Sequence, residues 1–164
     1  MKAWLDADPV GMGEYAIAAA TGRLAVRGLG SCIAVVLHDP VAVMGGIAHV
    51  MLPSHTLARD QERPAKFADT GIPLLVEELV RLGAQQERLV ARLIGGARMF
   101  ETVDMSGAVH MGERNVLACR VALEEAGVAL GAEDVGGGRG RSILYDVEKG
   151  TVAVRMLGGE DHYV

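Results

Sequence analysis

Two cysteines and five histidines carry the side chains of this sequence best suited to nucleophilic chemistry. Cys32 follows directly on Gly28-Leu29-Gly30-Ser31, whose small residues allow a sharp backbone corner. Such a corner lets backbone N–H groups point toward one place, where they can stabilise an oxyanion. This pattern predicts Cys32 as a nucleophile, with Gly30 and Ser31 as oxyanion or positioning residues. The alternative is a buried cysteine at the start of a strand, because free cysteine is among the most buried residue types.

His49 is the histidine that the predicted strand pairing brings to Cys32. An apolar, β-branched strand begins at Cys32, and a turn at residues 39–42 separates it from a return strand. Symmetric pairing about that turn places Cys32 directly opposite His49, and opposed residues share a face with Cβ atoms ~4.5–5.5 Å apart. In such a pair the imidazole can take the thiol proton and later protonate the leaving group. A β-bulge at Gly45 or Gly46 would instead turn His49 to the other face.

The other cysteine and histidines fit structural or surface roles. Cys119 lies in the middle of a predicted helix, on its apolar face, and is expected to be a core thiol. His38 lies about 20 Å along the strand from Cys32, at ~3.3 Å per residue, and is expected to be solvated beside the turn. Three histidines in predicted loops or the tail are expected at the surface: His55, His110 and His162. No CxxC, HxxxH or HExxH spacing occurs, so no metal and no cofactor is predicted.

The elements that must position these residues predict a mixed α/β or α+β domain. Strand patterns occur at residues 14–20, 23–27, 32–38, 43–52, 88–94, 128–135, 142–147 and 151–156, and helical periodicity at 67–82 and 113–126. This order predicts helices packed on a large, mainly antiparallel sheet system. A long polar loop, 53–64, follows the strand of His49. The glycine-rich run 136–141 lacks the pattern of a phosphate loop and is expected to be a mobile loop or a rim near a substrate.

Composition narrows the function further. The 164 residues fit one domain, 1–164. A net charge of −5 and an aromatic content of 4% disfavour nucleic acid as a partner. The most apolar stretch, 41–52, is shorter than the ~20 residues of a transmembrane helix, which argues against membrane insertion. The N-terminal residues turn acidic where a signal peptide would be apolar. We therefore expect a cytoplasmic protein with reduced cysteines.

A series of motifs runs in order along nearly the whole chain. They are GLGSC at 28–32, DP at 39–40, HVMLP at 49–53, KFAD at 66–69, GGARMF at 95–100, GERN at 112–115, DVGG at 134–137 and Arg141. Together they resemble the chemoreceptor glutamine deamidases, the CheD family. The family's nucleophile maps onto Cys32 and its general base onto His49, the pair that the strand register also selects.

The resemblance also implies a fold, a reaction and partners. The fold would be a layered α-β-β sandwich with mixed, mainly antiparallel sheets and two main helices. The reaction would be hydrolysis of particular glutamine side-chain amides on chemotaxis receptor helices, leaving glutamates. Some members also hydrolyse glutamate methyl esters. A further implied partner is the phosphatase CheC.

The sequence departs from the family pattern at residue 26. Members often have a catalytic threonine six residues before the cysteine, where it orients the histidine, but Val26 has no hydrogen-bonding side chain. The second imidazole nitrogen of His49 then needs another partner, such as a backbone carbonyl or water. Without such a partner, Val26→Thr would raise turnover. The departure favours an alternative function, a deamidase-like module that binds receptors or CheC with little turnover.

Overall fold

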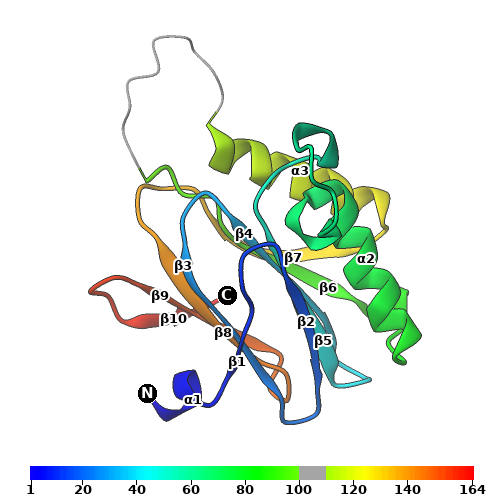
Figure 1. Cartoon of the computed structure of the whole chain (residues 1–164). Coiled ribbons are helices and arrows are strands. Elements are labelled where there is room, and N and C mark those ends of the chain that lie inside the picture. The colour runs from blue at the N-terminus through cyan, green and yellow to red at the C-terminus, as the bar shows by residue number, and fades with distance from the viewer. Residues whose placement is uncertain (100–109) are drawn as a thin grey trace.

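Two stacked five-stranded sheets form the body of the molecule, and two long helices cover one of them (Figure 1). The computed structural model describes residues 1–99 and 110–164 of the chain. The strands are β1 (Asp8–Pro9), β2 (Tyr15–Ala19), β3 (Arg23–Leu29), β4 (Ile33–Asp39), β5 (Met44–Val50), β6 (Val90–Gly95), β7 (Ala129–Val135), β8 (Arg141–Asp146), β9 (Thr151–Met156) and β10 (Asp161–Tyr163). The helices are α1 (Lys2–Leu5), α2 (Ala68–Arg81) and α3 (Met111–Glu125), with 3₁₀ turns η1 (His55–Leu57), η2 (Pro64–Lys66) and η3 (Gln86–Arg88).

The layers follow from the strand order of the two sheets. The inner sheet has the order β2-β5-β4-β6-β7, and α2 and α3 pack on its outer face. The second sheet has the order β1-β3-β8-β9-β10 and packs on the opposite face. The expected layered α-β-β sandwich with mixed sheets and two main helices is therefore confirmed. The short elements α1, β1 and β10 carry no periodic pattern and were not expected.

The central strand β4 is buried on both faces, as its continuous apolar sequence predicts. Ile33, Val35 and Leu37 pack in the cluster beneath the helices. Ala34 and Val36 pack in the cluster between the two sheets. Complete burial of each large aliphatic side chain contributes roughly 1.5–3 kcal/mol. These two clusters pack against both faces of β4, which begins immediately after Cys32.

The turn between β4 and β5 is longer than the sequence predicted. Asp39 pairs with Met44, so four residues form the connection instead of two. The Asp39 carboxylate Oδ1 accepts the N–H groups of Val41 and Ala42, each at 3.0 Å. Val43 completes the reversal with a positive φ of 48°. A buried carboxylate that organises its own turn thus sets the register of the hairpin.

This longer turn corrects the predicted pairing of Cys32 with His49. His49 lies opposite Ala34, two residues along from the expected partner. A slip of two residues preserves the face of every side chain, whereas a slip of one would reverse it. Cys32 and His49 are therefore diagonal neighbours on the face toward the second sheet. The pairing runs continuously through Gly45 and Gly46, where the alternative placed a bulge.

Candidate active site

Cys32 lies at a corner between β3 and β4 that neighbouring segments hold by backbone hydrogen bonds. Ala97 N–H donates to the Gly30 carbonyl at 2.8 Å, and Gly96 N–H donates to the Cys32 carbonyl at 2.9 Å. Gly95 has φ of 121°, and a Cβ there would lie 2.2 Å from the Cys32 carbonyl oxygen. Glycine is thus required beside the cysteine, because its neighbour approaches the backbone closely.

Two backbone N–H groups at this corner have no acceptor among the described residues. Within residues 1–99 and 110–164, no oxygen accepts a hydrogen bond from the N–H of Ser31 or Cys32. The thiol is half-buried, and this burial raises the pKa of Cys32 above its ordinary value. The backbone N–H of Cys32 itself opposes this rise. Among the described residues, the corner therefore combines a protonated thiol with two backbone N–H groups that donate to no oxygen.

His49 is buried on β5, with 3% of its surface exposed. Its Nδ1 lies 3.4 Å from the carbonyl oxygen of Val10 in a long hydrogen bond. A carbonyl only accepts, so the nitrogen that faces it carries the proton. Nε2 then has a lone pair, and it is buried with no partner among the described residues. Burial lowers the pKa of His49, so the neutral, basic imidazole is favoured.

The segment that carries Val10 surrounds the backbone of His49. His49 N–H donates to the Glu14 carbonyl at 2.9 Å, and Gly13 N–H donates to the His49 carbonyl at 3.0 Å. Val10 N–H in turn donates to the Ala25 carbonyl of β3 at 2.9 Å. The carbonyl that contacts the imidazole is thus anchored by the backbone of β3. A backbone carbonyl, one of the two partners expected for the second imidazole nitrogen, therefore contacts Nδ1.

Val26 lies in the core between the two sheets and is fully buried. It pairs with Ile143 of β8 and shares an apolar cluster with Val10. The Val26 side chain contributes apolar packing here and has no group that could form a hydrogen bond. Its neighbour Ala25 supplies the carbonyl that holds Val10, so β3 acts on His49 through backbone atoms.

Cys32 and His49 form a neutral pair in this structure. No hydrogen bond joins their side chains, both of which the structure describes. Diagonal neighbours on antiparallel strands are ~7–8 Å apart, a separation that an aromatic side chain such as imidazole can span. Burial shifts the two pKa values in the directions that favour thiol and imidazole over thiolate and imidazolium. His49 can accordingly act as a general base when the thiol attacks.

The second thiol has no such apparatus. Cys119 is fully buried on the face of α3 that packs against the inner sheet. Burial raises its pKa to about 12. This confirms the predicted core thiol.

The other histidines differ in burial: His38 is buried, His55 and His110 are half-buried, and His162 is exposed. His38 was expected to be solvated but is 8% exposed, and its Nδ1 lies 2.6 Å from the Tyr145 hydroxyl. The reason is that the second sheet covers this end of β4. His162 is exposed and contacts Asp134 at 2.7 Å, as a surface histidine should. His110 is half-buried.

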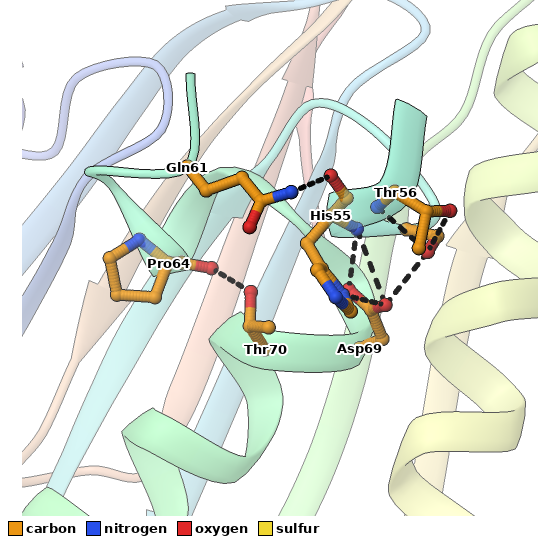
Figure 2. A network of polar contacts seen from close by, with 7 residues as sticks. His55, Thr56, Gln61, Pro64, Asp69 and Thr70 are labelled. Carbon is orange, nitrogen blue, oxygen red and sulfur yellow. Dashed lines mark hydrogen bonds and ion pairs between the residues drawn. The ribbon is translucent and has the colours of Figure 1, made fainter. Parts of the chain in front are cut away.

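His55 belongs to a surface network that follows the strand of His49 (Figure 2). Its Nδ1 lies 2.7 Å from Asp69 Oδ2, at the first turn of α2. Ser54 Oγ donates to the same carboxylate at 2.8 Å. The serine proton is directed to the aspartate, not to the histidine, so these three residues do not form a nucleophile–base–acid relay. The network instead fastens the 53–64 loop to α2.

Asn115 is a site residue that the sequence indicated only as the last residue of the GERN motif. It is fully buried in α3, and its Nδ2 donates to the carbonyls of Ser31 and Met51, each at 3.0 Å. The available signal was a polar residue on the core-facing side of a helix. Its targets lie far away in the sequence, so no local pattern could identify them.

A glycine-lined pocket of about 450 Å³ opens beside the cysteine corner. Gly96, Gly112 and residues 136–138 form much of its wall. Buried Arg141 donates to the carbonyls of Gly95 and Gly136 at 2.8 and 2.6 Å, so it ties this wall to β6. Residues 136–138, expected to be a mobile loop or a rim near a substrate, thus line a pocket whose wall includes neither Cys32 nor His49. Phe100, part of one quoted motif, lies outside the described residues.

Comparison with known proteins decides the family. The family model described as "CheD chemotactic sensory transduction" matches residues 51–156. The "Chemoreceptor glutamine deamidase CheD" of Thermotoga maritima is 47% identical over 150 residues, covering 92% of this chain and 92% of the relative. The chain belongs to the CheD family.

Other CheD relatives cover the chain to a similar extent. The "Probable chemoreceptor glutamine deamidase CheD" of Desulforamulus reducens is 45% identical, covering 91% of this chain and 90% of the relative. That of Pyrococcus abyssi is 41% identical, covering 92% of this chain and 93% of the relative. The family model begins after Cys32 and His49, but these alignments include both positions because they omit less than a tenth of the chain. None of the helices in the described part of this CheD chain has the length and apolar character needed to cross a membrane.

Proposed function

We propose that this protein hydrolyses glutamine side-chain amides of chemoreceptors to glutamates and ammonia, with Cys32 as nucleophile and His49 as general base and acid. One observation carries the proposal. Within the described part of the chain, a buried imidazole whose Nε2 has no partner shares a face with a thiol at a corner whose N–H groups donate to no oxygen. The names of the relatives supply the substrate class.

The reaction proceeds through a thioester. Nε2 of His49 takes the thiol proton as Cys32 Sγ attacks Cδ of the glutamine. Charge develops on the amide oxygen, and the N–H groups of Ser31 and Cys32 stabilise it. Imidazolium returns the proton to the departing nitrogen, which leaves as ammonia. His49 then removes a proton from water, which attacks the thioester and releases glutamate and the free thiol.

The Val10 carbonyl supports this role of His49. It accepts the Nδ1 proton in both states of the ring, and the hydrogen bond strengthens when the ring becomes imidazolium. Hydrogen bonds to charged groups contribute ~1.5–3 kcal/mol. The carbonyl therefore supplies what the side chain of Val26 lacks. This observation favours an enzyme over the alternative of a CheD-like binding module with little turnover.

The proposal extends to three further properties. A methyl ester has the same acyl centre as an amide and a better leaving group, so glutamate methyl esters are included as substrates. CheC is included as a binding partner on the family resemblance. One domain over 1–164 acts in the cytoplasm, where the receptor helices that carry the glutamines are exposed.

Mass spectrometry of a receptor cytoplasmic fragment incubated with the protein tests the function. We expect conversion of specific glutamines to glutamates, together with stoichiometric ammonia release. Cys119→Ala serves as the matched thiol control and should convert the same residues. A fragment left unchanged by folded wild-type protein, while still binding to it, would establish the binding module instead.

A further inference from the structure

Asn115 joins the two chain segments that carry the proposed nucleophile and base. Its Nδ2 donates to the Ser31 carbonyl, one residue before Cys32, and to the Met51 carbonyl, two residues after His49. The side chain is completely buried in α3. One amide group thus holds the ends of two neighbouring strands at the place where the chemistry is proposed.

We propose that Asn115 is a positioning residue that sets the plane of the Ser31–Cys32 peptide and thereby aims the Cys32 N–H at the oxyanion. The inference rests on the proposed function. A trans peptide is planar, and its C=O and N–H point in opposite directions. A hydrogen bond that fixes the Ser31 oxygen therefore fixes the direction of the Cys32 N–H.

The flanking peptides show why this contact matters. The Gly30 and Cys32 carbonyls are held by backbone N–H groups of Ala97 and Gly96. The Ser31 carbonyl lies between them and is held by a side chain. Its orientation consequently depends on the identity of one residue, and a substitution at 115 can change it alone.

The approach of α3 to this corner is close enough for such control. A Cβ at Gly112 would lie 2.5 Å from the Gly96 oxygen and 3.1 Å from the Ala97 oxygen. Glycine in the first turn of α3 therefore lets the helix contact the backbone that also binds the Gly30 and Cys32 carbonyls. Asn115 follows on the same side of the helix and reaches the remaining carbonyl.

The oxygen of the Asn115 side chain indicates that this position needs an amide for its N–H donors. Asn115 Oδ1 is buried and has no hydrogen-bond partner within the described part of the chain. An unpaired buried oxygen is costly, so the need to fill space would not by itself favour an amide here. Because both acceptors are carbonyls, the nitrogen must face them. The asparagine keeps an unfavourable oxygen in order to present two N–H groups.

Asn115→Asp tests the proposal because it keeps the size of the side chain and removes both donors. Removing an oxyanion donor typically lowers turnover by ~10²–10³-fold. We expect a loss of that size in kcat for receptor-fragment deamidation, with KM little changed. Iodoacetamide alkylation of Cys32, measured in the Cys119→Ala background, needs the thiol but no oxyanion site, and its rate should be unchanged.

Gln86→Glu is the matched control. Gln86 Nε2 donates to the Ala126 carbonyl at 2.6 Å, beyond the opposite end of α3, so this variant removes an amide–carbonyl bond of the same kind away from the site. It should leave kcat unchanged. Asn115→Ser, which retains one neutral donor, replaces Asn115→Asp if the charged variant does not fold, and should show a smaller loss.

A geometric measurement separates this inference from the proposed function. Residual dipolar couplings of the Cys32 amide should change in Asn115→Asp, while those of β4 remain as in the wild type. This result does not require any turnover. Equal losses in alkylation and deamidation, or an unchanged Cys32 coupling, would overturn the positioning role. Wild-type protein without deamidation would instead refute the proposed function.

Discussion

The two cysteines carry the same functional group in opposite backbone settings. Cys119 lies within α3, where a helical backbone uses its N–H groups internally and apolar neighbours enclose the sulfur. Cys32 lies at an irregular corner, where other segments hold the carbonyls and two N–H groups donate to no oxygen of residues 1–99 and 110–164. Burial raises the pKa of both thiols, and for Cys119 to about 12. The comparison shows that nearby backbone donors and a base, more than the thiol itself, distinguish a reactive site.

The largest expected effect tests that comparison directly. Cys32→Ala should lower kcat/KM for deamidation by about 10⁴-fold or more, as loss of a nucleophile does in other hydrolases. Cys119→Ala should leave activity intact and lower the free energy of unfolding by ~1 kcal/mol, a common cost of a small core truncation. Ammonia release and denaturant unfolding measure the two quantities. Inactivity of a folded Cys119→Ala protein would show that the wrong thiol was chosen.

The histidines offer a second version of the same contrast. His49→Gln should reduce kcat by about 10³-fold, within the range for loss of a general acid–base. His55→Gln should retain full activity, although in the described residues it is His55 whose ring nitrogen contacts a carboxylate, that of Asp69, and His49 contacts a carbonyl. Steady-state kinetics on one receptor fragment decide between them. If His55→Gln proved the more damaging variant, the base would have been assigned to the wrong region.

The pH dependence follows from the direction of the His49 shift. Burial lowers the pKa of His49, so the basic imidazole persists at lower pH than in an exposed histidine. The acid limb of kcat/KM should therefore have its midpoint below ~6.5. The free energy of unfolding should change in the same direction. As pH falls, His49 binds a proton in the unfolded chain at a higher pH than in the folded chain. The stability that neutral His49 contributes is therefore present above the unfolded pKa of ~6.5 and is lost as pH falls toward the lower folded pKa. An acid limb centred above ~6.5 would contradict the burial argument.

The smallest expected effect on activity concerns residue 26. The Val10 carbonyl already occupies His49 Nδ1, and Val26 is packed in apolar surroundings. Val26→Thr should therefore leave kcat/KM unchanged and lower the free energy of unfolding by ~1–3 kcal/mol, the cost of an unpaired buried hydroxyl. Kinetics and thermal unfolding of the same preparation measure both. A clear gain in turnover would mean that the long Val10 contact does not orient the ring.

Much of the architecture is already determined by local sequence patterns. Apolar runs and 3.6-residue periodicity locate every long strand and both main helices, because these patterns are short-range. The same alternation predicts that Cys32 and His49 share a face. This prediction holds although the turn is longer than expected, since a shift of two residues preserves side-chain direction. The glycine corner likewise identifies the candidate nucleophile.

Other features arise only from contacts between distant segments. β2 and β3 are three residues apart, yet they pair in different sheets, and no local propensity encodes that separation. The β4–β5 register depends on Asp39, whose carboxylate binds its own turn and also Arg88 at 2.8 Å.

The hydrogen-bond partners of the site residues also come from distant segments of the chain. His49 meets a carbonyl 39 positions away, and Asn115 meets one 84 positions away. Backbone carbonyls occur at every residue, so sequence alone determines which side chains can do chemistry, and packing decides which carbonyl each one meets.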